Sequence, residues 1–230
     1  LSRASFHETA LGLAELESVL EGVPPVYRKL FSFQPLSDPD LLIGRSDAQT
    51  FIERHLEQFE LGMPQAAVLV GGPSSGRTSL LNVIAGTMLR EHDVRWMRIN
   101  ERPTSARQLL QLMRSSLRLD IPEADSIPEA ARKMLARDPQ GKAPLCLVEH
   151  METLMMRGIG GYDLFADMLQ FMSLTDSRII WIGTVSSFAW QIMESANQSA
   201  AVLVNRHTLA DLSRADLERL VMERHRKSGV

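Results

Sequence analysis

The sequence predicts an α/β fold, a parallel β-sheet with helices on both faces, from two observations. Short runs of consecutive apolar residues recur along the chain, and such runs are typical of strands that are buried on both faces. Amphipathic segments lie between these runs, and this alternation favours parallel strands joined by helical crossovers. With 44% hydrophobic and 23% charged residues, the chain has the composition of an ordinary globular protein.

The predicted elements follow one another in a regular order. Residues 7–21 form an amphipathic helical pattern that Pro24 and Pro25 interrupt, because proline cannot continue a helix. Apolar runs predict strands at 66–70, 94–99, 145–148, 178–183 and 200–204. Helical periodicity predicts helices at 48–60, 78–91, 105–117, 128–136, 162–173, 187–194 and 214–227.

One segment carries a pattern for binding phosphate. A strand and a helix flank the loop Gly71-Gly72-Pro73-Ser74-Ser75-Gly76-Arg77-Thr78-Ser79, which is the context in which G-x-x-x-x-G-K-[ST] holds nucleotide phosphates. Gly71 and Gly76 permit backbone conformations in which successive N–H groups point at an anion. The N-terminus of the following helix adds positive partial charge. Thr78 places a hydroxyl where Mg²⁺ needs a ligand, so the loop predicts ATP or ADP with Mg²⁺.

The lysine of this pattern is replaced by Arg77. Arginine keeps the positive charge, but its broad planar fork is not interchangeable with a compact ammonium group. The fork can pair with phosphate oxygens bidentately, although it is less suited to bridging the β- and γ-phosphates. The loop therefore favours nucleotide binding and argues against rapid hydrolysis. A glycine-rich turn without a ligand is the alternative.

Two further strands end in polar residues. Glu149 follows the strand at 145–148 directly, at the place where an acid organises Mg²⁺ in nucleotide hydrolases with such a loop. His150 comes next, where a glutamate usually polarises water, and histidine can also act as a base. Thr184 ends the run that begins at Arg178 and could contact the γ-phosphate or position the attacking water. The alternative is that these residues only mark the ends of strands.

Taken in order, these segments resemble AAA+ ATPases, and within them the STAND and origin-recognition branch. The residues that carry the resemblance are Ile43-Gly44-Arg45, the loop from Gly71 to Ser79, Glu149 to Leu154, and Thr184. The resemblance covers about residues 41–230 and implies a P-loop NTPase three-layer sandwich with strand order 5-1-4-3-2. It also implies that Gly44 and Arg45 lie near the base, that Glu149 holds Mg²⁺ through water, and that Thr184 is the sensor.

The resemblance also suggests how the chain is organised. Residues 1–40 are expected to be a helical leader or linker, and residues 41–205 the nucleotide-binding core. Residues 206–230 would be a lid-like helical tail or a linker to a further domain. Because the chain begins with Leu1 rather than Met, we expect it to be a piece of a longer protein.

Three functions fit these residues. The first is an ATP-binding regulatory switch in a larger multidomain protein, with slow or absent hydrolysis, because the departures at Arg77 and His150 fall on the catalytic machinery. The second is an active AAA+ ATPase that remodels or loads partners on DNA. The third is a pseudo-ATPase that acts as an assembly scaffold. Expected partners are other domains of the same protein, further copies of the chain or a related ATPase.

Composition bears on the partners and the cellular compartment of the protein. The net charge of -3 gives no global electrostatic case for nucleic acid as a partner. A single cysteine, Cys146, cannot form an internal disulfide, which favours a reducing compartment such as the cytoplasm. No apolar run approaches the length of a membrane span, and no signal-peptide pattern opens the chain.

Overall fold

The structure is a computed structural model that describes residues 24–31, 34–138, 141–156 and 160–229. The helix predicted at 7–21 lies outside the described residues. The chain divides into two compact units. The larger unit is Leu36–Asp211, and the smaller one combines the segments before and after it, up to Pro35 and from Leu212.

The larger unit is built on a five-stranded parallel sheet with the order β2-β3-β4-β1-β5. The strands are β1 (Ala67–Gly71), β2 (Val94–Arg98), β3 (Leu145–Glu149), β4 (Ile180–Ser186) and β5 (Asn205–Thr208). Read from β5, this order is 5-1-4-3-2, so the predicted topology is confirmed. Because every pair of neighbours is parallel, the carboxyl ends of all five strands lie along one edge of the sheet.

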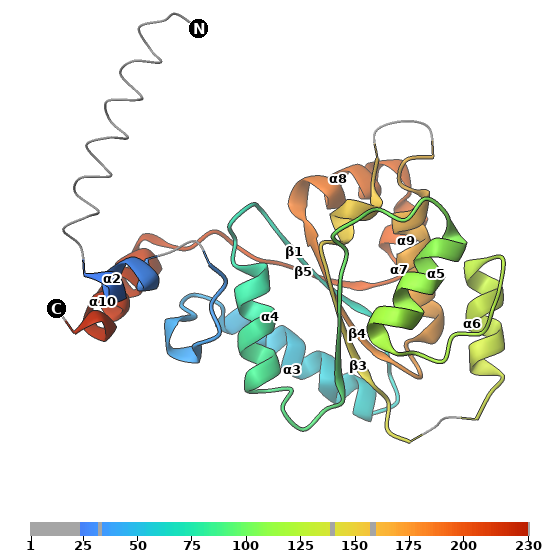
Figure 1. The fold of residues 1–230 in the computed structure, drawn as a ribbon, viewed down its shortest axis with the longest axis horizontal. Coiled ribbons are helices and arrows are strands. Elements are labelled where there is room, and N and C mark those ends of the chain that lie inside the picture. The colour runs from blue at the N-terminus through green and yellow to red at the C-terminus, as the bar shows by residue number, and fades with distance from the viewer. Residues whose placement is uncertain (1–23, 32–33, 139–140, 157–159, 230) are drawn as a thin grey trace, which may run out of the picture. The chain divides into compact units, whose positions relative to one another are not determined.

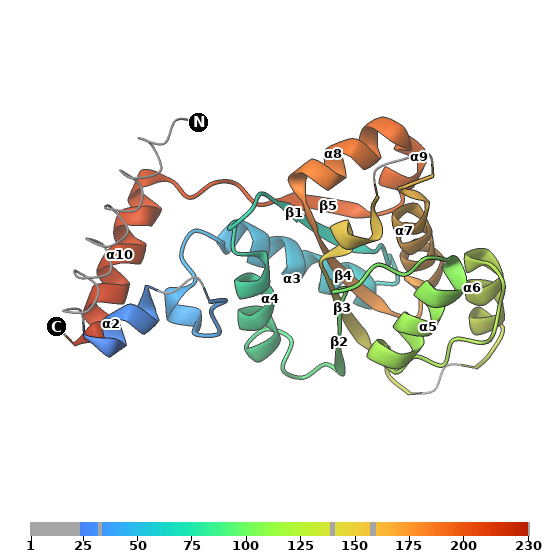
Figure 2. The same ribbon diagram turned by 45° about the horizontal axis from the view of Figure 1, so that its top comes forward.

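Helices cover both faces of this sheet, as Figures 1 and 2 show. They are α3 (Ser46–Glu60), α4 (Arg77–Gly86), α5 (Ala106–Leu117), α6 (Ile127–Leu135), α7 (Asp163–Thr175), α8 (Ser187–Ala196) and α9 (Gln198–Ala201). Two short 3-10 helices, η1 (Pro39–Leu41) and η2 (Met151–Leu154), lie in the connections. The predicted three-layer α/β fold is therefore confirmed.

Each face of the sheet carries its own hydrophobic core. Leu69 and Leu147 pack with side chains of α3 and α4. Their neighbours Val68 and Val148 point the other way and pack with side chains of α5, α6, α7 and α8. Since successive side chains of a strand alternate between faces, both cores are filled only if the strands are apolar throughout. This is why the central strands are continuous apolar runs in the sequence.

Three predicted boundaries are wrong. The run at 200–204 was predicted as a strand, but α9 occupies residues 198–201 and the strand follows at Asn205–Thr208. The helix predicted at 78–91 already ends at Gly86, where Thr87 leaves the helical conformation. The strand predicted at 178–183 instead runs from Ile180 to Ser186, because β4 stays paired with β1 as far as Gly71.

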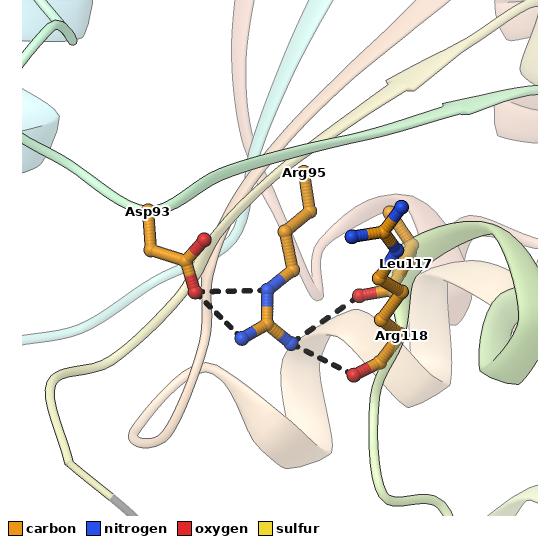
Figure 3. Close-up of polar contacts among 4 residues, drawn as sticks. All are labelled: Asp93, Arg95, Leu117 and Arg118. Carbon is orange, nitrogen blue, oxygen red and sulfur yellow. Dashed lines mark hydrogen bonds and ion pairs between the residues drawn. The ribbon is translucent and has the colours of Figure 1, made fainter.

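A guanidinium fixes the beginning of β2 to the end of α5 (Figure 3). Arg95 donates from Nε and Nη2 to Asp93 Oδ2, at 3.0 and 2.6 Å. Its Nη1 donates to the carbonyl oxygens of Leu117 and Arg118, at 3.3 and 2.9 Å. The last carbonyls of a helix lack partners within the helix, and here Arg95 provides them.

The smaller unit contains α2 (Pro25–Leu30) and α10 (Arg214–Ser228). Tyr27 stacks on Phe31 with ring centroids 4.5 Å apart, and His225 of α10 meets the Tyr27 ring edge-on at 6.1 Å. A reciprocal capping box between Ser213 and Asp216 begins α10, which confirms the helix predicted there. Within the described part of the chain, no helix combines the length and apolarity needed to cross a membrane.

Candidate functional site

The loop between β1 and α4 lies at the carboxyl edge of the sheet and has the backbone that its glycines predict. Gly76 is left-handed, with φ of 82°, and immediately precedes the first turn of α4. An added Cβ at Gly71 would collide with Ser75 Oγ. The Ser75 N–H donates to the Gly72 carbonyl at 3.2 Å and closes a turn. The backbone conformation therefore requires glycine at Gly76, whereas a side chain at Gly71 would displace the side chain of Ser75.

The beginning of α4 fits an anion. The first N–H groups of a helix have no partner within the helix, and no side chain of the described residues caps α4. The helix dipole adds positive partial charge at this end. Together with the turn at Gly71–Gly76, these donors suit a phosphate group, and Thr78 stands in the first turn of the helix.

Arg45 is buried, with 6% of its surface exposed, and its guanidinium binds the backbone of the loop. Its Nη2 donates to the Ser75 carbonyl at 2.8 Å, and its Nη1 donates to the carbonyls of Gly44 and Ala210, at 2.8 and 3.0 Å. The structure thus brings Arg45 to the loop, and the carbonyl of Gly44 accepts from the same guanidinium. The guanidinium joins the loop to the segment that follows β5, a link that the sequence pattern did not reveal.

Ser79, the last residue of the predicted loop, contacts the beginning of the larger unit. Its Oγ accepts a hydrogen bond from the Leu36 N–H at 3.0 Å. One turn further along α4, Asn82 Nδ2 donates to the Leu36 carbonyl at 3.2 Å. The chain at residue 36 is therefore fastened to α4 by both of its backbone polar groups.

Arg77 points at a carboxylate. Its Nη2 lies 3.1 Å from Glu152 Oε1, and its Nη1 donates to Glu152 Oε2 at 3.4 Å. The side chains are partly buried, with 15% of Arg77 and 25% of Glu152 exposed. Glu152 Oε2 also accepts the Ser186 N–H at 3.1 Å, at the end of β4. The cation of the loop is thus paired within the chain.

Glu149 is fully buried at the end of β3. Its Oε2 accepts from Arg98 Nε of β2 at 2.5 Å, and Arg98 also lies over the Trp96 ring at 5.4 Å. Its Oε1 is buried and has no hydrogen-bond partner among the described residues. A carboxylate with one free oxygen, at the edge that carries the loop, fits a water bound to Mg²⁺.

The described residues contain no group of three or more His, Cys, Asp or Glu side chains that could hold a metal ion. Mg²⁺ usually keeps several waters and takes one or two protein ligands together with substrate phosphates. Thr78 and Glu149 would serve as such a minimal protein set.

His150 and Thr184 lie in contrasting surroundings. His150 is exposed, and its backbone is left-handed with φ of 61°, so the chain turns sharply from β3 into η2. Thr184 is only 3% exposed and lies within β4, opposite Leu69 of β1. Both residues stand near the carboxyl edge of the sheet, and their catalytic roles stay predictions.

A cavity of about 610 Å³ lies at the opposite edge, where β2, β3 and β4 begin. Its basic lining residues are Arg95, Arg118, Arg137, Lys142 and Arg178. Arg178 donates to the carbonyls of Leu135 and Arg137 at 3.2 Å, and Arg137 pairs with Asp120. Arg95, Arg137 and Arg178 therefore bind carbonyl or carboxylate groups of the chain itself. This cavity is separate from the loop, and no motif in the sequence indicated it.

Comparisons with known proteins bear on the fold. No protein-family model and no curated protein matches the sequence. Solved structures do match. The ORC1 protein of Aeropyrum pernix, solved in complex with DNA, is 15% identical with a TM-score of 0.56, over 82% of this chain and 51% of that one. The ORC2 protein of the same organism, in ADPNP-ADP complexes, is 13% identical with a TM-score of 0.58, over 86% and 56%.

A Walker-type ATPase of Pyrococcus abyssi is also similar, at 13% identity and a TM-score of 0.55, over 87% of this chain and 63% of that one. The chain therefore spans only about half to two-thirds of these structures. At such identities the likeness concerns the fold. It agrees with the strand order and with the place of the loop between β1 and α4. The chain has the fold of an AAA+ P-loop ATPase domain.

Proposed function

We propose that this chain is an ATP-binding switch module of a longer protein, with slow or absent hydrolysis. The observation that carries the proposal is the loop at Gly71–Ser79, which has a left-handed Gly76 and an uncapped helix N-terminus behind it. This loop would hold the phosphates, while Thr78 and Glu149 would hold Mg²⁺, directly and through water. The ion would supply positive charge to the phosphates. The proposal includes the domain division predicted from the sequence. Residues 1–40 would be a leader or linker, residues 41–205 the nucleotide-binding core, and residues 206–230 a lid-like tail or a linker to a further domain.

The residues at the motif positions of the loop and of β3 support slow turnover. Arg77 replaces the lysine and is paired with Glu152. Glu149 is already held by Arg98, and the position of the activating glutamate is taken by the exposed His150. A switch needs different affinities for its two states and does not need fast catalysis. Thr184, buried near the end of β4, would sense the γ-phosphate.

Two other functions each have an observation in their favour. An active AAA+ ATPase working on DNA is supported by the likeness to the ORC1 protein, which was solved with DNA. The net charge of -3 does not exclude such a partner, because a local basic surface would be enough. A scaffold that binds no nucleotide is supported by the Arg77–Glu152 ion pair, which neutralises the loop without any ligand.

The proposal also covers the cellular compartment and the partners of the protein. Cys146 is fully buried in β3, and burial raises the pKa of its thiol to about 12. A lone buried thiol suits a reducing compartment, so we place the protein in the cytoplasm. Its partners would be other domains of the same protein, further copies of the chain or a related ATPase.

The experiment is a titration of the purified protein with ATP and with ADP, each with and without Mg²⁺, followed by single-turnover hydrolysis with and without duplex DNA. A switch binds both nucleotides, with different affinities, and hydrolyses ATP slowly whether or not DNA is present. Hydrolysis that DNA accelerates would favour the remodelling ATPase instead. A folded protein that binds neither nucleotide would leave the scaffold.

A further inference from the structure

The ion pair between Arg77 and Glu152 involves both terminal nitrogens of the guanidinium. Both terminal nitrogens of Arg77 contact the two carboxylate oxygens of Glu152, at 3.1 and 3.4 Å. Only the contact between Nη1 and Oε2 has the geometry of a hydrogen bond, and it is long, so the pair is held mainly by charge attraction. The pair is also partly buried, so water and salt screen it less than they screen an exposed pair.

Glu152 is fixed from a second side. It lies on η2, and its Oε2 accepts the Ser186 N–H at 3.1 Å. Ser186 is also the N-cap of α8, where its Oγ accepts the Ala189 N–H at 3.2 Å. The carboxylate therefore lies between the cation of the loop and the beginning of α8. Its position does not depend on Arg77 alone.

A carboxylate and a phosphate offer a guanidinium the same pair of oxygen acceptors. The nitrogens that Arg77 commits to Glu152 are those that would bind phosphate oxygens. Arg77 cannot direct the same two nitrogens at the carboxylate and at a phosphate at once.

We propose that Glu152 competes with nucleotide phosphate for Arg77, so that nucleotide binding transfers the arginine fork from the carboxylate to the phosphate. This inference rests on the proposed function. It gives a role to the arginine that stands at position 77 where the phosphate-binding pattern has lysine. A compact lysine ammonium lacks the fork that matches a carboxylate. It also predicts a preference for ligands with several phosphates, since their higher charge displaces the carboxylate more effectively than a monophosphate does.

The test is Glu152→Gln. Glutamine has nearly the same shape, and its amide oxygen still accepts the Ser186 N–H, so α8 keeps its contact. Removing the charge frees Arg77, and the Kd for ATP and for ADP should fall by about fivefold or more, with and without Mg²⁺. Glu129→Gln is the matched control, because Glu129 pairs with Lys133 on α6 at 2.7 Å. It should leave both values unchanged.

A second pair of variants separates competition from simple charge repulsion. In an Arg77→Ala background, Glu152→Gln should bring no gain, because no cation is left to release. A gain that persists there would mean that Glu152 repels phosphate directly, and this would overturn the competition.

The remaining outcomes are also decisive. If wild type binds nucleotide and Glu152→Gln binds it equally or more weakly, the inference fails and the proposed function stands. Weakening that appears only with Mg²⁺ would make Glu152 a metal ligand, which also overturns the inference. If neither protein binds ATP or ADP, the proposed function fails together with the inference.

Discussion

His55 of α3 is a titratable group sealed into the core. Only 2% of its surface is exposed. Burial disfavours the charged imidazolium and lowers the pKa of His55 from 6.5 to about 4. The folded protein therefore keeps this side chain neutral at pH values where the unfolded chain would protonate it.

This shift predicts a pH-dependent stability. Between about pH 6.5 and pH 4 the unfolded chain binds more protons at His55, so the free energy of unfolding falls as the pH falls. From pH 7 to pH 5 the loss attributable to His55 is about 2 kcal/mol. His55→Leu should remove this part of the pH dependence, whereas His92→Leu should not. Urea denaturation at both pH values measures it. An unchanged dependence in His55→Leu would contradict the assignment.

At the scale of elements, the turn from β1 into α4 can be tested with two glycines. Gly76 is left-handed and its missing Cβ would meet nothing within 4 Å, so Gly76→Ala tests conformational strain alone. It should lower the free energy of unfolding by about 1–2 kcal/mol. Gly86, the last residue of α4, also faces open space and has no positive φ. There alanine should be neutral or stabilise by up to about 1 kcal/mol.

Thermal or urea unfolding of the two variants gives the comparison directly. Equal effects of Gly76→Ala and Gly86→Ala would mean that the left-handed turn at Gly76 does not exist in solution. Nucleotide affinity provides a second measurement, because only Gly76 belongs to the loop. It should fall for Gly76→Ala and stay constant for Gly86→Ala.

The same elements show what the sequence could predict. The central strands β1, β3 and β4 are buried on both faces, so their apolar runs identify them without knowledge of the fold. The edge strand β5 pairs only with β1 and alternates between half-buried and exposed residues. Its sequence, Asn205–Thr208, therefore carries no apolar run. The strand was instead predicted at the apolar residues 200–204 just before it.

The partners within the site depend on tertiary structure. Glu152 reaches Arg77 from 75 residues away in the sequence, and Arg98 reaches Glu149 from 51 residues away. No local pattern of residues specifies either pair. The motif pointed to the loop at 71–79 and to Glu149 at the end of β3, but it could not show that Arg77 and Glu149 each have a counter-ion within the chain.

At the scale of the whole molecule, both cores and the loop belong to the larger unit. Every buried residue of the two hydrophobic clusters lies between Leu36 and Asp211, and so do the contacts of Leu36 with α4. A fragment of residues 36–211 should therefore fold cooperatively and keep the nucleotide affinity of the full chain. Circular dichroism during urea unfolding, followed by an ATP titration, tests this. A fragment that does not fold would show that the ends of the chain are needed.

The proposed switch requires that the chain bind nucleotide through Arg77 and its loop. Calorimetric titration of ATP into wild type and Arg77→Ala tests it most directly, with Arg137→Ala as a control at the opposite edge of the sheet. We predict that wild type and the control bind equally, and that Arg77→Ala binds more weakly by about 1–3 kcal/mol, as expected for a lost charge-assisted contact. A folded wild type without affinity for ATP, or an Arg77→Ala variant with unchanged affinity, would contradict the claim.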